Sequence, residues 1–137
     1  MIVIDTHVLV WLVQGDPRLG AVAQDVIATA RRTNGASIPT IMSWEMAMLA
    51  DRERLALRME TGLWFTHVVA TGGFRWIALT PEIGIDAGTL PGAIHGDPAD
   101  RLMIATARHL ACPILTADEK ILAYATAGHV AAIDARV

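Results

Sequence analysis

The segment Met1-Ile-Val-Ile-Asp-Thr-His-Val-Leu-Val-Trp11 places two hydrophobic patterns on either side of a single acidic residue. The four residues before Asp5 are apolar and mostly β-branched, as in a strand that is buried on both faces. Thr6 to Gln14 is apolar almost all round and ends at Gly15-Asp16-Pro17, which predicts a short buried helix. A buried strand followed at once by a helix is typical of a parallel α/β sheet.

The rest of the chain repeats this alternation of short apolar runs and helical patterns. We expect strands at Met1–Ile4, Ala36–Pro39, Arg75–Leu79, Pro113–Leu115 and His129–Ile133. We expect helices at Thr6–Gln14, Leu19–Arg32, Thr40–Ala50, Glu60–Thr71, Pro81–Leu90, Pro98–Ala111 and Ala117–Tyr124. Strands that alternate with helices predict an α/β sandwich around a mostly parallel sheet.

Length and composition indicate one folded domain. The 137 residues are 53% hydrophobic and 18% charged, so the chain can bury a large core, which excludes a disordered protein. We find no internal repeat or linker, so we expect a single domain over residues 1–137. The mean hydropathy of +0.42 is high for a monomer, which suggests that a partner covers some apolar surface.

No segment is expected to cross a membrane. The longest uncharged run, Thr61 to Phe74, is shorter than the ~20 residues that a spanning helix needs. The N-terminus lacks the basic region of a signal peptide, so we expect a cytoplasmic protein. The lone Cys112 excludes an internal disulfide and is expected to be an inert buried thiol.

The net charge of −3 gives no general electrostatic reason to bind nucleic acid. All but one of the 11 basic residues are arginine, whose planar side chain suits phosphates and carboxylates. Coding bias explains this preference more simply.

Two acidic residues directly follow predicted strands. Asp5 ends the first strand, and Asp118 follows Pro113–Leu115 at the start of the next helix. Ligands bind outside the carboxyl ends of parallel strands, which places both residues at one crevice. The alternatives are a surface turn for Asp5 and a first-turn charge for Asp118, inside a capping box formed by Thr116 and Glu119.

Further acidic residues lie on helices that face the same crevice. Glu45 is the only charge in the apolar segment Ile41–Ala50, where a carboxylate is unfavourable unless it is paired or bound to a metal. An equally good alternative is a narrow solvent-exposed stripe beside Ser43. Asp97 suits an N-cap before Pro98, and Asp100 suits the first turn of that helix, with an apolar face behind it that directs it inward.

Carboxylates that converge on one crevice repel one another unless a hard divalent cation holds them. Without cysteines or clustered histidines, such a site suits Mg²⁺ or Mn²⁺ rather than Zn²⁺. Such an ion can activate a water molecule and stabilise in-line displacement at a phosphodiester. The acidic residues therefore favour a metal-dependent nuclease.

Other common chemistries lack their motifs. There is no Walker motif, no G-x-G-x-x-G and no G-x-S-x-G. An aspartyl-phosphate enzyme of the haloacid-dehalogenase pattern needs an aspartate where this chain has His7. The five histidines show no metal-ligand spacing and are expected to be structural or exposed: His7, His67, His95, His109 and His129. The four tryptophans lie within apolar runs, which favours core or dimer packing over base stacking.

Four segments together resemble the PIN-domain family, and within it the VapC-type ribonuclease toxins. They are Asp5-Thr-His-Val-Leu-Val-Trp11, Ser43-Trp-Glu45, His95-Gly-Asp-Pro-Ala-Asp-Arg-Leu-Met-Ile-Ala-Thr-Ala107 and Leu115-Thr-Ala-Asp118. They occur in the family's order along almost the whole chain, and His-x-Asp-Pro-x-Asp-Arg is the most specific of them. The resemblance implies a three-layer α/β/α PIN-like (Rossmann-like) sandwich and a Mg²⁺- or Mn²⁺-dependent endoribonuclease.

The resemblance also implies roles for single residues. The family's acidic quartet matches Asp5, Glu45, Asp100 and Asp118, with Asp5 and Asp100 as the main metal ligands. Thr6 and Thr116 match polar positions near that site, and Asp97 matches a capping or supporting position. Arg101 matches a position that can steady a carboxylate or contact phosphate.

The implied partners are an RNA substrate, a VapB-like antitoxin that covers an apolar groove, and a second copy in a homodimer. Two alternatives stay open at this point. One is a metal-binding PIN-like module that acts mainly in regulation, and the other is a nuclease of the same fold that acts on DNA or structured RNA.

Overall fold

The computed structural model describes residues 1–137, which fold around a five-stranded sheet whose strand pairs are all parallel. The strands are β1 (Ile2–Ile4), β2 (Ala36–Pro39), β3 (Phe74–Ile77), β4 (Ile114–Thr116) and β5 (Ala132–Asp134). Their order in the sheet is β3-β2-β1-β4-β5. The three inner strands are wholly buried, as the continuous apolar runs predict, because helices cover both faces of a parallel sheet.

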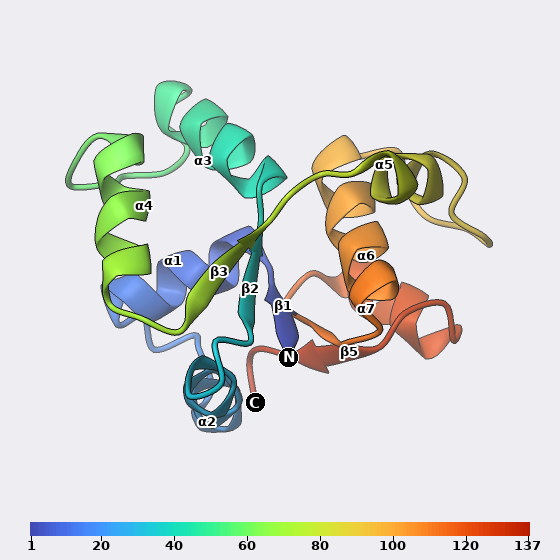
Figure 1. The fold of residues 1–137 in the computed structure, drawn as a ribbon, viewed down its shortest axis with the longest axis horizontal. Helices are drawn as coiled ribbons and strands as arrows, with labels where there is room; N and C mark the ends of the chain where they lie inside the picture. Colours follow the sequence, from blue (N-terminus) through green and yellow to red (C-terminus); the bar gives the residue numbers. More distant parts are fainter.

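Seven helices form the outer layers of this α/β/α sandwich. They are α1 (Thr6–Gln14), α2 (Ala21–Arg31), α3 (Ile41–Asp51), α4 (Thr61–Ala70), α5 (Pro81–Gly88), α6 (Pro98–Leu110) and α7 (Glu119–Thr126). Helices α1, α2 and α4 lie on one side of the strands and α5, α6 and α7 on the other, while α3 stands at one end of the sheet (Figure 1). The predicted fold class is confirmed.

All the predicted strands and helices are present, most of them with shifted ends. The last strand was expected at His129–Ile133 but occupies Ala132–Asp134, because residues 127–130 form the turn that follows α7. Two of the four tryptophans, Trp11 and Trp64, are buried as expected, whereas Trp44 and Trp76 are 50% and 38% exposed. No helix in the structure is long and apolar enough to cross a membrane.

The strand order has one consequence for function. The chain runs from β1 outward to β3 on one side, and then crosses to β4 and β5 on the other side of β1. The order of the strands therefore reverses between β1 and β4, and open α/β sheets form their ligand crevice at such a point. Asp5 directly follows β1, and Asp118 lies two residues beyond β4.

Candidate active site

Asp5 joins the ends of the two central strands. Its side chain is only 7% exposed. Its Oδ1 accepts a hydrogen bond of 2.7 Å from the backbone N–H of Thr6 and so caps α1, and its Oδ2 accepts one of 2.6 Å from the hydroxyl of Thr116, at the end of β4. Asp5 is therefore a buried link across the point where the strand order reverses, and the surface-turn alternative is wrong.

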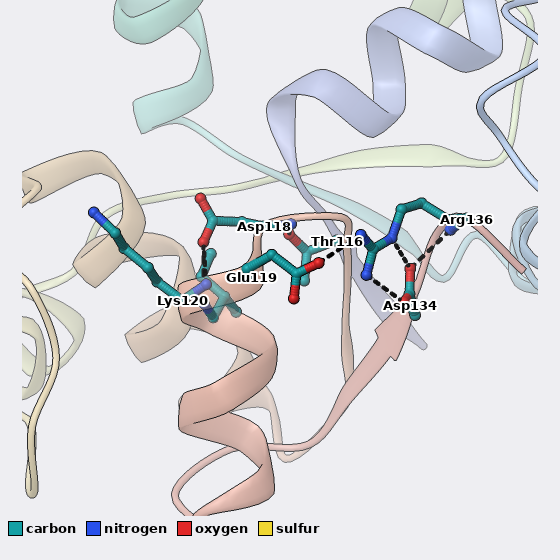
Figure 2. A network of polar contacts seen from close by, with 7 residues as sticks. Thr116, Asp118, Glu119, Lys120, Asp134 and Arg136 are labelled. Atoms are coloured by element: carbon teal, nitrogen blue, oxygen red, sulfur yellow. Dashed lines mark hydrogen bonds and ion pairs between the residues drawn. The ribbon is translucent and has the colours of Figure 1, made fainter.

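Asp118 is the N-cap of α7, not a first-turn charge. Its Oδ1 accepts hydrogen bonds from the backbone N–H groups of Lys120 and Ile121, at 2.8 and 3.1 Å. The alternative of a capping box formed by Thr116 and Glu119 is wrong, because Glu119 turns away and pairs with Arg136 at 2.6 Å (Figure 2). The same bonds leave Oδ2 of Asp118 free of protein donors, so this oxygen is available to a ligand.

The start of α6 brings two more carboxylates to the crevice. Asp97 is the N-cap, as expected, and its Oδ1 accepts a hydrogen bond of 3.0 Å from the N–H of Asp100. Pro98 occupies the first helical position, which places Asp100 in the first turn. Arg101 contacts neither carboxylate. Its guanidinium donates to the carbonyl oxygens of Ala87 and His95, which fixes the loop that precedes the helix.

Glu45 reaches the crevice from α3. It is half-buried, and burial is the main reason why its pKa is raised. The negative charges of Asp5 and Asp97 raise this pKa further, which indicates that their carboxylates lie close to Glu45. Thr6 Oγ1 is also buried here, without a hydrogen-bond partner, close enough to Glu45 to favour the ionised form of that carboxylate. The alternative of an isolated solvent-exposed stripe for Glu45 is wrong.

Asp100 lies at the centre of the cluster. Two groups of possible ligand atoms include it, and within each group all atoms lie within 4.8 Å of one another. One group consists of His95, Asp100 and Asp118, and the other consists of Glu45, Asp97 and Asp100. Asp5 belongs to neither group, and both of its oxygens accept hydrogen bonds. Asp100 is thus the carboxylate that the two groups share, while the assignment of Asp5 and Asp100 as the main metal ligands stays a prediction.

The electrostatics agree with this arrangement. Burial, followed by the charges of the surrounding carboxylates, raises the pKa of Asp100 to about 8. The contributing carboxylates are Asp5, Asp97, Asp118 and Glu45. The pKa of Asp5 is also raised by burial, in part offset by its bonds to Thr116 and Thr6. These groups therefore share one site in which negative charge is unfavourable in the absence of a cation.

Two residues of this cluster were not among the predicted metal ligands. Asp97 was expected at a capping or supporting position, and its carboxylate also lies with those of Glu45 and Asp100. His95 was expected to be structural or exposed, yet its Nε2 lies 3.1 Å from Oδ2 of Asp100. The spacing of histidines indicates a metal site only where several of them recur. Here a single histidine lies beside the carboxylates of Asp100 and Asp118, so only its place in the motif His-x-Asp-Pro-x-Asp-Arg could have indicated its role.

An open pocket of about 450 Å³ gives access to the cluster. It is lined by His95, Asp97, Asp100, Asp118, Glu119 and Lys120. Lys120, the only lysine of the chain, is exposed and forms no ion pair. In Figure 2 its ammonium group points to the same side of α7 as the carboxylate of Asp118, away from the pair formed by Glu119 and Arg136. The pocket therefore has carboxylates at its base and the unpaired ammonium group of Lys120 at its rim.

The donor set fits a hard divalent cation. Carboxylate oxygens dominate both ligand groups, and this is the chemistry that Mg²⁺ and Mn²⁺ prefer. The buried hydroxyl of Thr6 lies beside Glu45, one of these carboxylates, and forms no hydrogen bond in the protein. The raised pKa of Asp100 shows that a positive charge at this place would relieve repulsion.

A second cavity lies elsewhere on the molecule and is mostly apolar. We call it the apolar groove: about 870 Å³, lined by Leu12, Val13, Gln14, Arg31, Ala56, Leu57, Arg58, Met59, Trp64, His67, Val68, Thr71 and Phe74. These residues come from α1, α4, β3, the end of α2 and the connection between α3 and α4. No residue of the groove lines the acidic pocket.

Comparison with known proteins places this arrangement in a family. A family model for the PIN domain matches residues 2–127, which include every carboxylate of the cluster. The chain belongs to the PIN domain family. The matched part of this PIN domain extends from β1 to the end of α7 and leaves out only the last strand and its flanking residues.

One relative and one solved structure extend this finding. The PIN domain described here is similar to Ribonuclease VapC22 of Mycobacterium tuberculosis, with 32% identity over 121 residues that make up 88% of each protein. Its fold is similar to that of a chain in a toxin-antitoxin complex from Klebsiella pneumoniae, with a TM-score of 0.64 over 98% of this chain and 97% of that one. Identity to that chain is 14%, so this second likeness is one of fold.

Proposed function

We propose that this PIN domain is a metal-dependent endoribonuclease and the toxin component of a VapBC-type toxin–antitoxin pair. The observation that carries the proposal is the pair of ligand groups that share Asp100, at the reversal point of the sheet. The similarity to a protein named ribonuclease supports RNA as the substrate. The donor chemistry favours Mg²⁺ or Mn²⁺ as the cofactor.

The position of each carboxylate indicates its role in binding the cation. Asp100 and Asp118, with Glu45 and Asp97 on the other side, would hold the cation. Asp5, locked by Thr6 and Thr116, completes the negative charge behind them. When bound, the ion supplies Lewis-acid activation of water and neutralises the charge that develops on the phosphodiester.

The substrate-binding side of the site faces solvent. The pocket is open enough for a phosphodiester to approach Asp100 and Asp118, and Lys120 at its rim provides one positive charge for the RNA backbone. The acidic chain as a whole offers no broad basic surface, so local contacts must select the RNA strand.

A cleavage assay tests this function. The chain, freed of any copurified protein, is incubated with total RNA and Mg²⁺ or Mn²⁺, beside an Asp100→Asn variant and a sample treated with EDTA. We expect discrete fragments in the wild type only. Folded wild-type protein that cleaves no RNA with either metal contradicts the proposal and favours a regulatory binding module. Cleavage of a DNA strand in preference to RNA favours a deoxyribonuclease of the same fold.

We further propose that the apolar groove binds the antitoxin. The groove is lined mainly by apolar side chains between α1 and α4, and a concave apolar surface with a few polar residues is typical of a partner-binding site. Arg31, Arg58 and His67 stand among its apolar residues, so a partner segment with apolar anchors and carboxylates would match it.

Self-association is a separate proposal. Ile85 on α5 is 69% exposed and Trp76 on the edge strand β3 is 38% exposed, and neither belongs to the apolar groove. These side chains are candidate contacts for the homodimer that the family resemblance implies. Sedimentation analysis of the purified chain tests this proposal. A chain that is still monomeric at roughly 100-fold the concentration used in the cleavage assay contradicts it.

A further inference from the structure

The loop between α5 and α6 holds His95 in a fixed place. The hydroxyl of Tyr124 donates to the carbonyl oxygen of Pro91, and Arg101 donates to that of His95. Gly92 has a φ of +72° and lies so close to the imidazole of His129 that a Cβ there would be 2.5 Å from its Nε2. The loop is thus tied to α6, α7 and the turn that follows α7, and its conformation is set by the fold.

The hydrogen bonds of this loop decide which nitrogen of His95 carries the proton. Nδ1 of His95 accepts a hydrogen bond of 3.2 Å from the backbone N–H of Asp97. Nδ1 must therefore present its lone pair, and in the neutral imidazole the hydrogen is on Nε2. Nε2 is consequently a donor and, in this tautomer, has no lone pair to offer a metal.

The Nε2–H group of His95 faces the carboxylate of Asp100 but forms no hydrogen bond with it. Nε2 is buried and lies 3.1 Å from Oδ2 of Asp100, but the N–H is not aligned with any acceptor. A buried donor without an acceptor is unfavourable by roughly 1–3 kcal/mol, so such groups are rare and usually have a function. Because the distance already suits a hydrogen bond, a small rotation of the imidazole or of the Asp100 carboxylate would align the N–H with Oδ2.

We propose that His95 is a positioning residue for the metal centre, whose Nε2–H holds Oδ2 of Asp100 while the other carboxylate oxygen binds the cation. The inference rests on the proposed function, since it assumes that Asp100 binds a metal there. It assigns His95 no contact with the cation itself. Outer hydrogen bonds of this kind orient metal ligands, and their loss typically weakens metal binding by roughly 10–100-fold.

Two substitutions separate the two hydrogen bonds of the ring. His95→Asn keeps an acceptor near the position of Nδ1 for the N–H of Asp97 but has no donor that reaches Asp100. His95→Gln places an amide N–H near the position of Nε2 but loses the acceptor for the loop. His109→Gln is the matched control, because His109 is exposed at the far end of α6.

The dissociation constant for Mn²⁺, measured by titration calorimetry without RNA, tests the proposal. We expect His95→Asn to weaken Mn²⁺ binding by about 10-fold or more, and His95→Gln and His109→Gln to stay within about threefold of the wild type. Melting temperatures in metal-free buffer verify that each variant is folded.

Three outcomes contradict the proposal. Unchanged binding in His95→Asn with weakened binding in His95→Gln means that the ring only anchors the loop. Equal losses in both variants mean that the imidazole itself is a ligand. A wild-type chain that binds no Mn²⁺ removes the centre altogether. If Mn²⁺ binds as expected but no RNA is cleaved, the ribonuclease proposal fails while the role of His95 stands.

Discussion

The acidic pocket and the apolar groove are two exposed surfaces of opposite chemical character on one small protein. The pocket lies over a cluster of carboxylates that follow β1, lie on α3 and begin α6 and α7, and burial together with their negative charges raises the pKa of Asp100 to about 8. The groove leaves apolar side chains of α1 and α4 facing a cavity of about 870 Å³. Each surface is unfavourable in the isolated chain, and each is relieved by a ligand of opposite character, a cation in one case and an apolar partner in the other.

The acidic pocket and the apolar groove can be altered independently of each other. They share no lining residue, and they draw on different helices. Substitutions at one surface should therefore leave the function of the other intact, since effects at distant sites are close to additive.

The largest expected effect follows from Asp100→Asn. Loss of this central carboxylate should lower the rate of RNA cleavage by about 10³-fold, because metal ions commonly contribute several kcal/mol to catalysis and every 1.4 kcal/mol is tenfold. Binding of the antitoxin at the apolar groove should be unchanged. Rates from initial fragment appearance provide the measurement. A variant that cleaves as fast as the wild type removes Asp100 from the site.

Gly92→Ala should disturb the pocket through its loop. A φ of +72° strains alanine, and its Cβ would collide with His129, so we expect a loss of about 2–3 kcal/mol in the free energy of unfolding. Gly15→Ala, at the end of α1 beside the groove, has a similar φ of +64° but no atom within 4 Å, and should lose only about 1 kcal/mol. Urea denaturation compares the two, and equal losses would refute the role of the collision.

Met59→Glu should disturb the groove alone. Met59 is 41% exposed, so the fold should tolerate the change, while a carboxylate in an apolar contact should weaken antitoxin binding by about 10-fold or more. Titration of the chain with its antitoxin measures the effect, and RNA cleavage by the free variant serves as the control. Full antitoxin affinity in Met59→Glu would place the partner elsewhere.

The pH dependence of stability should differ between wild type and Asp100→Asn. The pKa of Asp100 rises from 3.8 in the unfolded chain to about 8 in the fold, so the folded state binds more protons between these values. The stability of the metal-free wild type should therefore fall as the pH rises from about 4 to 8, and Asp100→Asn should lack this contribution. At pH 8 we expect the variant to melt at least roughly 3–5 °C higher, because every 1 kcal/mol of destabilisation that is removed produces about that shift in a domain of this size. Equal melting temperatures at pH 8 would show that the repulsion is absent.

The smallest expected effect concerns Lys120. Lys120→Met should weaken RNA binding about two- to threefold and reduce the slope of log affinity against log salt by about one, without changing Mn²⁺ affinity. Arg32→Met is the control, since Arg32 follows α2 and precedes β2, which puts it towards the amino ends of the strands, whereas the acidic pocket lies at their carboxyl ends. An unchanged salt slope would mean that Lys120 contacts no phosphate.

Elements with a clear local signal were predictable. The buried run before Asp5, the glycine that ends α1 and the Asp97-Pro98 start of α6 each depend on neighbours in the chain, so their positions follow from the sequence. The last strand lacked such a signal, since it is a half-buried edge strand and its pairing with β4 sets its ends. Thr116 and Glu119 satisfied the pattern of a capping box, but Arg136 from the C-terminal segment engages Glu119 instead.

The sequence by itself determined the alternation of strands and helices, the acidic residues at strand and helix ends, and the motif order that resembles the PIN family. Only the tertiary structure decided that β1 and β4 are neighbours, that Asp100 rather than Asp5 lies between the two ligand groups, and that His95 faces Asp100. The physical reason is the distance along the chain over which each interaction acts. Periodicity and capping act over a few residues, whereas carboxylate repulsion and a 3.1 Å contact depend on which elements pack together.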